Sequence, residues 1–317
     1  MTSTPYLQDL ASLLSRSLAR LPRPFRDREI RYLEASQTPT GGFAGPRGEP
    51  DLYYTSFALR AAAMLDLADR GFWERSAAFL RTAAPVPADP ADVLSLLVAS
   101  GLLAARGVLL WSESVAAERL ADCRAVLERF RASPAGFAKT PAGAPSLYHT
   151  FLAALACELL AEPRPDPGET VRLVLSRRSP AGGFADTPDA ESPGTNPTAA
   201  GVALLRTLRA LDPATAEPAA AFLLGEQRPD GGFAAHPGAP VSDLLSTFTA
   251  LVALADVRAL RRARLADVGR FVRKLALSSG GFAPVLAGGS SDVEYLFYGL
   301  GSLALLASEL PPDPGLG

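Results

Sequence analysis

The sequence has few of the residues on which several classes of protein depend. It contains 2 cysteines, Cys123 and Cys157, which excludes a scaffold held by several disulfides and a four-cysteine metal site. Its 31 basic and 33 acidic side chains leave a net charge of −2 at pH 7. Because no basic excess is available to neutralise phosphates, the composition does not fit a nucleic-acid-binding protein.

Long hydrophobic runs are also missing. The longest relevant run, 93–105, has 13 residues and ends at Arg106, whereas a membrane-spanning helix needs ~20. Residues 1–21 contain Asp9, Arg16 and Arg20 without an uninterrupted apolar stretch, so they do not resemble a secretory signal. We therefore expect a cytoplasmic protein with no transmembrane segment. Hydrophobic residues still make up 48% of the chain, which excludes a disordered one.

Glycine and proline are abundant, and both recur periodically. The string Gly-Gly-Phe-Ala begins at Gly41, Gly182, Gly231 and Gly280, and a shortened copy surrounds Phe137. The phenylalanines of these copies are 94, 47, 49 and 49 residues apart. Because the first interval is twice the second, we expect a degenerate copy near position 90 and six repeats in all. The chain there reads Pro87-Ala88-Asp89-Pro90-Ala91-Asp92, followed by an apolar run.

Each repeat has one helix-patterned segment before the glycines and a second, more apolar one after the following loop. The first segments carry charged residues and are predicted over 28–36, 171–178, 218–227 and 265–277. The second segments are rich in Leu and Ala and are predicted over 56–67, 147–160, 198–211, 244–254 and 293–306. Polar residues stand where the second helices should begin, and they are predicted N-caps: Asp51, Ser146, Ser242, Asp243 and Asp292.

This pattern predicts an all-α fold. A helix that is apolar all round must be buried on all sides. Two helices in each repeat therefore indicate an α/α toroid of about six helical hairpins, with apolar helices in an inner ring and amphipathic ones outside. Residues 28–308 would form this domain, 1–27 an N-terminal helical extension and 309–317 a tail. An open solenoid is the alternative, but it would need polar capping repeats, and the apolar segment 296–306 argues against it.

The repeat resembles that of the protein prenyltransferase β-subunits and of the squalene-hopene and oxidosqualene cyclases. Two copies are similar to the cyclase-type QW repeat with Phe in place of Trp: Tyr32-Leu33-x3-Gln37-x3-Gly41-Gly42-Phe43 and Phe222-Leu223-x3-Gln227-x3-Gly231-Gly232-Phe233. The length and the segment 182–192 look most like the geranylgeranyl transferase β-subunit. The resemblance covers about residues 28–308 and implies the toroid fold, whereas any chemistry depends on particular residues.

The transferases of this family hold zinc through an Asp and a Cys two residues apart and a His in the next repeat. Asp243 matches the Asp, but Leu245 stands at the Cys position and Tyr295 at the His position. Leucine cannot bind zinc, and tyrosine would be an unusual ligand. We therefore expect no metal site, with Asp243 the only retained family ligand, and no other cofactor.

Two other family features are not expected either. The basic residues that hold the diphosphate in the transferases fall about at His236 and 238–239, with Tyr148 and Pro193 replacing two more. The sequence contains no Asp-x-Asp-Asp string, which supplies the acid in the cyclases; the nearest segment, 194–199, reads Gly-Thr-Asn-Pro-Thr-Ala, so all three acids are replaced. Neutral side chains cannot supply a strong acid.

The remaining candidates are polar and aromatic residues at the predicted starts of the second helices. The candidate catalytic residues are Asp243, Glu294 and Tyr295, and the candidate ligand-binding residues are Tyr54, Tyr148, His149, Asn196 and Tyr298. Structural roles remain open for them, namely helix capping for Asp243, hydrogen bonding at a helix start for His149 and rim packing for the tyrosines. A tyrosine-lined mouth would suit a lipid headgroup or a carbocation.

An axial cavity lined by the apolar helices would suit a long hydrocarbon. The sequence therefore predicts a prenyltransferase- or terpene-cyclase-like protein that binds an isoprenoid or another apolar ligand without zinc-dependent catalysis. Two alternatives stay open: an active prenyltransferase or cyclase with a rearranged site, and a non-catalytic scaffold. An α-subunit-like protein partner is conceivable because the transferases work with one. The high Ala, Arg and Pro content favours a bacterial source.

Overall fold

The computed structural model describes residues 5–46, 48–83, 86–132, 135–162 and 166–310. These residues form thirteen α-helices, a short 3₁₀ helix at Leu260–Arg262 and two pairs of two-residue strands. The chain divides into two compact units. Unit 1 comprises residues 1–128, 275–284 and 288–317, and unit 2 comprises 129–274 and 285–287. Most of the predicted tail, from residue 311 onward, lies outside the described residues.

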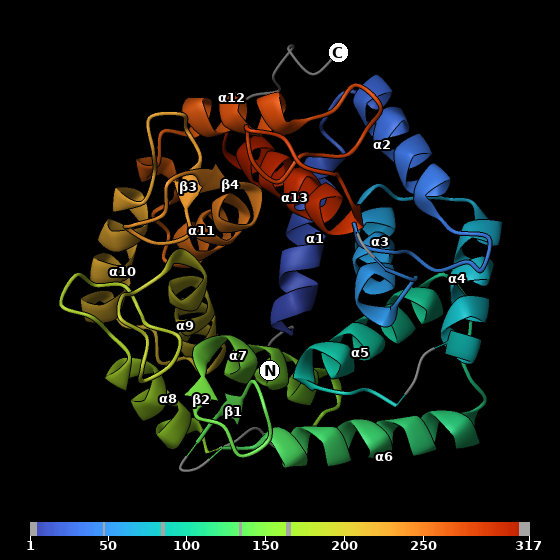
Figure 1. The fold of residues 1–317 in the computed structure, drawn as a ribbon, viewed down its shortest axis with the longest axis horizontal. Coiled ribbons are helices and arrows are strands. Elements are labelled where there is room, and N and C mark those ends of the chain that lie inside the picture. The colour runs from blue at the N-terminus through green and yellow to red at the C-terminus, as the bar shows by residue number, and fades with distance from the viewer. Residues whose placement is uncertain (1–4, 47, 84–85, 133–134, 163–165, 311–317) are drawn as a thin grey trace. The chain divides into compact units, whose positions relative to one another are not determined.

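Unit 1 brings helices from both ends of the chain together. It contains α1 (Tyr6–Leu18), α2 (Arg23–Ser36), α3 (Leu52–Met64), α4 (Arg70–Ala83), α5 (Pro90–Ala105), most of α6 (Glu113–Phe130) and α13 (Val293–Glu309). Helix α3 packs against both α5 and α13, and α1 lies against α13 and also contacts α3 (Figure 1). The last helix of the chain is thus a neighbour of the first and third.

Unit 2 repeats the same packing within one continuous stretch of sequence. It contains α7 (Leu147–Leu159), α8 (Pro167–Ser176), α9 (Thr195–Thr207), α10 (Pro213–Gly225), α11 (Leu244–Asp256) and nearly all of α12 (Leu265–Leu275). Helix α9 packs against both α7 and α11, and α8 and α10 pack on α9. Two antiparallel pairs precede α7 and α11: β1 (Phe137–Ala138) with β2 (Pro145–Ser146), and β3 (Phe233–Ala234) with β4 (Ser242–Asp243).

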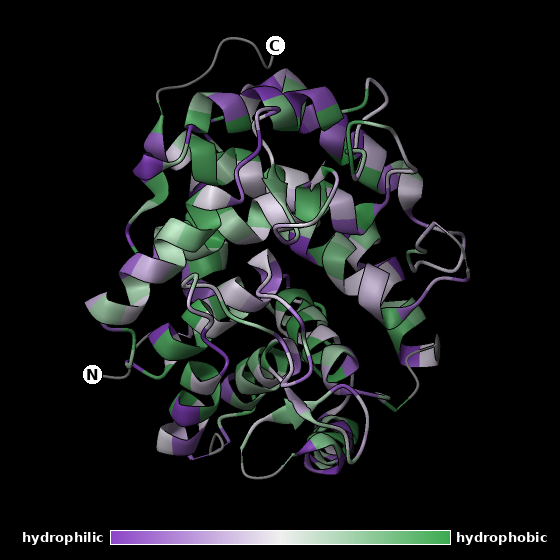
Figure 2. Ribbon diagram, turned by 60° about the vertical axis from the view of Figure 1, so that its left-hand side comes forward, coloured by the Kyte–Doolittle hydropathy of each residue, from purple (hydrophilic) through white to green (hydrophobic). Residues whose placement is uncertain are grey.

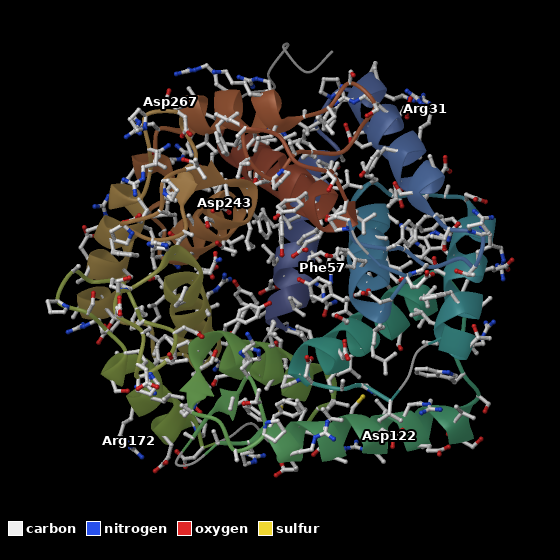
Figure 3. The ribbon with its side chains drawn as sticks, in the orientation of Figure 1. Arg31, Phe57, Asp122, Arg172, Asp243 and Asp267 are labelled. Carbon is white, nitrogen blue, oxygen red and sulfur yellow. The ribbon has the colours of Figure 1, made fainter. Side chains whose placement is uncertain are left out.

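The helices fall into two kinds, as the repeat pattern predicts. We call α3, α5, α7, α9, α11 and α13 the core helices and α2, α4, α6, α8, α10 and α12 the flanking helices. Core helix α13 buries 12 of its 17 residues. The flanking helices are amphipathic, so hydrophilic and hydrophobic residues are mixed along the ribbon in Figure 2. Charged residues of four flanking helices are labelled in Figure 3: Arg31, Asp122, Arg172 and Asp267.

The predicted helix starts are confirmed at four of five positions. The side chains of Asp51, Ser146, Asp243 and Asp292 each accept a hydrogen bond from a backbone N–H in the first turn of the helix that follows. The prediction for Ser242 is wrong. This residue lies in β4, where its hydroxyl donates to the Asp230 carboxylate over 2.8 Å, and Asp243 caps α11 instead. The degenerate repeat also follows the rule, because Asp89 caps α5.

Each Gly-Gly-Phe string forms the same tight turn. Its first glycine has a φ of +93° at Gly41 and Gly182, +100° at Gly231 and +94° at Gly280, a region that disfavours side chains. A Cβ at Gly231 would also lie 2.2 Å from the carbonyl oxygen of Asp267 in flanking helix α12 of the next repeat. Glycine is therefore required both by the backbone conformation and by the close approach of the next helix.

The phenylalanine of the turn is fixed from the other side by a core helix. Its backbone N–H donates to a threonine hydroxyl in four repeats, in the pairs Phe43–Thr55, Phe137–Thr150, Phe184–Thr198 and Phe233–Thr247, over 2.9–3.1 Å. Each of these rings is fully buried. The motif glutamine adds a link to the next flanking helix, because Gln227 Nε2 donates to the carbonyl oxygen of Arg264 and Oε1 accepts from its N–H.

The last turn of the chain packs on the first flanking helix, within unit 1. A Cβ at Gly280 would lie 2.5 Å from the Cβ of Tyr32 in α2. The Gly281 N–H donates to the buried Glu29 carboxylate over 2.7 Å, and Arg28 pairs with the same carboxylate at 2.8 Å. Burial raises the pKa of Glu29, and these two partners oppose that shift. Glu29 thus joins the first repeat to the last.

The turn geometry predicts that Gly231→Ala lowers the free energy of unfolding by at least about 2 kcal/mol, since the new Cβ adds both backbone strain and overlap with α12. Urea unfolding followed by circular dichroism measures the change. Gly225→Ala is the matched control, because a Cβ at this helical position meets nothing within 4 Å, and alanine there should be neutral or stabilising by up to about 1 kcal/mol. Equal effects at both positions would contradict the proposed role of the turn.

Candidate functional site

The candidate residues from the sequence fall into two groups, one in each unit. Unit 1 holds Tyr54, Glu294, Tyr295 and Tyr298, and unit 2 holds Tyr148, His149, Asn196 and Asp243. Within unit 1, Glu294 and Tyr298 lie one turn apart on α13 and face Tyr53 of α3. Both tyrosine hydroxyls donate to the same oxygen, Glu294 Oε1, over 2.8 Å from Tyr53 and 2.9 Å from Tyr298.

Aromatic rings surround this carboxyl group. Phe57 of α3 lies at the centre, with its ring centroid 5.0 Å from that of Tyr53, 5.4 Å from Phe297 and 5.6 Å from Tyr298, all in edge-to-face geometry. Such pairs are favourable because the positive edge of one ring meets the negative face of another. We call Tyr53, Phe57, Phe297 and Tyr298 the aromatic cluster. Phe57 is labelled in Figure 3, on the side of α3 that faces α1.

The guanidinium group of Arg60 lies beside the aromatic cluster. The guanidinium carbon of Arg60 lies 4.8 Å from the centre of the Phe57 ring, within the range of a cation–π interaction. Tyr53, Phe57 and Arg60 occupy positions i, i+4 and i+7 of α3, so they share one face of the helix. Tyr53, Arg60, Glu294 and Phe297 are all half-buried, which leaves part of this face accessible.

The electrostatics of the site act on the carboxyl group of Glu294. Burial raises the pKa of this carboxyl above its ordinary value and outweighs the two tyrosine hydrogen bonds and the Arg60 charge, which lower it; nearby Asp292 raises it further. Burial and the charges of Asp292 and Glu294 also raise the pKa of Tyr54 to about 12. The Tyr54 ring meets Tyr53 edge-on at 5.4 Å, and Tyr295 lies 6.1 Å from Tyr298.

Sequence reasoning missed Phe57, Arg60 and Phe297, and it selected Tyr54 as the candidate where the neighbouring Tyr53 donates to Glu294. The signal was present for two of them, because Phe57 and Arg60 share a helical face with Tyr53 and Arg60 is the only charged residue in α3. Phe297 has no comparable signal, since one more aromatic residue in an apolar helix is indistinguishable from a core residue.

In unit 2, a short hydrogen-bonded chain positions His149. The Asp186 carboxylate accepts from the Ser146 hydroxyl over 2.9 Å, and Ser146 Oγ lies 3.1 Å from His149 Nδ1. Because Ser146 has one proton and the carboxylate can only accept, Nδ1 must donate to Ser146 Oγ. The same Asp186 oxygen accepts from the Tyr148 N–H over 2.9 Å, and the Tyr148 ring meets the imidazole edge-on. This network fixes the imidazole at the start of α7.

The other two candidates in unit 2 are held by separate contacts. Asn196 Oδ1 accepts from the Thr249 hydroxyl over 2.6 Å, which links α9 to α11. Asp243 Oδ1 accepts from the Ser246 N–H over 2.7 Å, as an N-cap does, and burial raises its pKa. The structure therefore shows a structural contact for each and does not join them to His149.

Comparison with known proteins identifies the family. The model of the prenyltransferase alpha-alpha toroid domain matches residues 7–85, 112–168, 151–224 and 198–311. The chain belongs to this family. Its all-α fold class is thus an α/α toroid, as the sequence predicts. A search of curated proteins gives no match.

Solved structures with the same fold include members of both expected branches of the superfamily. The type II terpene cyclase MstE from Scytonema has a TM-score of 0.59 at 17% identity, over 94% of this chain and 98% of that one. A variant of MstE in complex with geranylgeranyl dihydroxybenzoate has a TM-score of 0.57 at 16% identity, over 95% and 98%. Candida albicans protein geranylgeranyltransferase-I complexed with GGPP has a TM-score of 0.51 at 16% identity, over 98% and 88%.

Two positions that correspond to zinc ligands in the transferases lie at the start of α11. Asp243 uses its carboxylate to cap α11, and Leu245, at the expected cysteine position, has no atom that can bind a metal. Across the described ranges, no three His, Cys, Asp or Glu side chains come together in a group that could hold a metal. No helix within those ranges is long and apolar enough to cross a membrane.

The network around His149 predicts that Asp186→Ala lowers the free energy of unfolding by about 1–3 kcal/mol, because the Ser146 hydroxyl and the Tyr148 N–H lose their acceptor. Urea unfolding measures this loss. Asp189→Ala in the same loop is the matched control: Asp189 is exposed, and its removal should change stability by no more than about 0.5 kcal/mol. Indistinguishable variants would show that Asp186 does not hold the start of α7.

The raised pKa of Glu294 predicts a pH-dependent contribution to stability. The folded toroid keeps this proton to a higher pH than the unfolded chain, so the contribution is present below pH 4.5 and is lost as the pH rises through the folded value. Glu294→Gln retains an oxygen acceptor but cannot ionise. We expect the variant to gain stability relative to the parent protein between pH 4.5 and pH 7.5. A constant difference between the two in urea unfolding would contradict the raised pKa.

Proposed function

We propose that this protein binds an isoprenoid-type ligand against the aromatic cluster of α3 and α13, without a zinc ion. The observation that carries the proposal is the cluster itself: four aromatic side chains and the only charged residue of α3 meet where core helices α3 and α13 pack together. An apolar site with a few convergent polar groups is the usual form of a small-molecule site.

The chemistry of the cluster suits an unsaturated hydrocarbon. Aromatic side chains provide a large and rigid apolar contact area, and they lose little conformational entropy when a ligand binds. The half-buried residues Tyr53 and Phe297 provide the accessible part of this surface, and the buried Phe57 ring packs against both. A purely structural core would not need a carboxyl group and a guanidinium group beside these rings, since each is costly to desolvate.

The ligands bound in two similar solved structures support an isoprenoid-type ligand. Geranylgeranyl dihydroxybenzoate in the MstE variant and GGPP in the Candida albicans transferase both contain a geranylgeranyl chain. The shared fold supports a shared ligand class, although it does not extend to a shared reaction. The axial cavity, the α-subunit-like partner and the cytoplasmic location predicted from the sequence stay predictions.

Calorimetric titration with farnesol and geranylgeraniol in the presence of EDTA tests the proposal. We expect saturable binding, and we expect Phe57→Leu to weaken it at least tenfold because the central ring of the cluster is lost. Phe271→Leu is the matched control. It removes a buried ring from flanking helix α12, so it should lower stability without lowering affinity.

Three further results would distinguish this proposal from zinc binding, from an enzyme and from a scaffold. Stoichiometric zinc in the purified protein, lost in Asp243→Ala, would overturn the zinc-free part of the proposal. Turnover of farnesyl or geranylgeranyl diphosphate with a peptide, or turnover of squalene, would assign the enzyme alternative. Absence of binding by both alcohols would contradict the proposal and favour a scaffold.

A further inference from the structure

Basic residues are concentrated in one short segment of unit 2. Between residues 258 and 274 the sequence has seven basic residues and a single acidic one, Asp267. The chain as a whole has 31 basic and 33 acidic residues, so 24 basic and 32 acidic residues are left for the rest of it. A protein whose net charge is −2 thus carries a segment of net charge +6 beside a remainder of −8.

The fold places these basic residues on one exposed surface. The 3₁₀ helix Leu260–Arg262 and helix α12 follow each other within the segment. On α12 the side chains of Val268, Phe271 and Val272 are fully buried, so the basic side chains lie on the solvent-facing side of this amphipathic helix. Of the seven, six residues are exposed and one, Arg273, is half-buried. We call the following residues the basic surface: Arg258, Arg261, Arg262, Arg264, Arg270, Arg273 and Lys274.

The ion pairs on the basic surface are of the weak, exposed kind. Asp267 pairs with both Arg264 and Arg270, and Glu217 of α10 pairs with Arg262. Pairs between side chains that water reaches contribute little to stability, because solvent screens them. These arginines can therefore exchange a carboxylate partner for another anion at small cost.

We propose that this protein binds, through the basic surface, to a lipid bilayer that contains anionic phospholipids. The choice of a bilayer rests on the proposed function, because an isoprenoid-type hydrocarbon partitions from water into membranes. Guanidinium groups form paired hydrogen bonds with phosphate oxygens. Each basic residue close to an anionic membrane adds to the attraction, and the basic surface provides seven of them.

The distribution of charge favours a bilayer over a nucleic acid. Helix α12 has 11 residues and is about 16 Å long, so the basic surface is short. A long nucleic acid would also meet the acidic remainder of the chain, which repels it, whereas a bilayer contacts one face of a protein. Lipids also move laterally within a bilayer and can gather beneath a small basic surface.

Sedimentation of the full chain with sucrose-loaded vesicles tests the proposal. Vesicles of phosphatidylcholine are compared with vesicles in which about one third of the lipid is phosphatidylglycerol. We expect the partition coefficient at about 50 mM salt to be at least about tenfold higher for the anionic vesicles. This advantage should be lost at about 500 mM salt, because salt screens the attraction between exposed charges.

A triple variant locates the contact. Arg258→Gln, Arg270→Gln and Lys274→Gln together remove three charges from the basic surface, and they should lower binding to anionic vesicles at least about tenfold. The matched control has the same net charge and should bind as the parent protein does. Circular dichroism melting checks that both variants are folded. The control replaces with Gln three exposed basic residues of flanking helices α2 and α4: Arg23, Arg31 and Arg70.

The possible failures are distinguishable. If the two kinds of vesicle bind equally, or if both variants lose binding to the same degree, the inference is wrong and the proposed function stands. If a DNA duplex binds and neither kind of vesicle does, the partner is a nucleic acid and the inference is wrong. If anionic vesicles bind as expected but neither farnesol nor geranylgeraniol binds, the proposed function fails and the basic surface remains a membrane contact.

Discussion

The hydrogen bond from the phenylalanine N–H of the turn to a core-helix threonine, present in four repeats, is the contact on which the architecture depends. It fixes the end of a flanking helix, the turn and the next core helix in one geometry. The first glycine of the turn cannot carry a side chain. A Cβ added there would lie 2.2–2.5 Å from an atom of a flanking helix at Gly41, Gly182, Gly231 and Gly280. One local motif thus orders three elements, and repetition of the motif builds each unit.

A second contact of the last turn explains how chain ends that are far apart in sequence become neighbours. In the last repeat Ser291 takes the place of threonine, and Glu29 of α2 accepts the Gly281 N–H. This carboxylate is buried, and its interactions with Arg28 and with the Gly281 N–H offset the cost of burying it. Its removal would leave that donor without an acceptor in a buried site. The position of α13 beside α3, and with it the aromatic cluster, therefore depends on a polar contact between the first and last repeats.

Most of the fold could be predicted from the sequence because the signals for it are local and repeated. The spacing of Phe137, Phe184, Phe233 and Phe282 gave the repeat, and Asp51, Ser146, Asp243 and Asp292 gave the helix starts. The strand pairs were not predicted, because Ser242 and Asp243 both stand just before an apolar segment and both are residue types that cap helices. The site was predictable only in part. Glu294 and Tyr298 stood out as polar residues in an apolar helix, whereas their partners Tyr53 and Phe57 belong to a helix some 240 residues away, and no local pattern states that pairing.

The central claim is that a prenyl chain lies against α3 and α13, and photoaffinity labelling tests it most directly. A farnesol analogue with a diazirine on the chain, irradiated with the protein and mapped by mass spectrometry, should modify residues within 53–60 and 294–298. Excess geranylgeraniol should suppress that modification. Modification confined to other segments, or modification that excess geranylgeraniol does not suppress, would contradict the account.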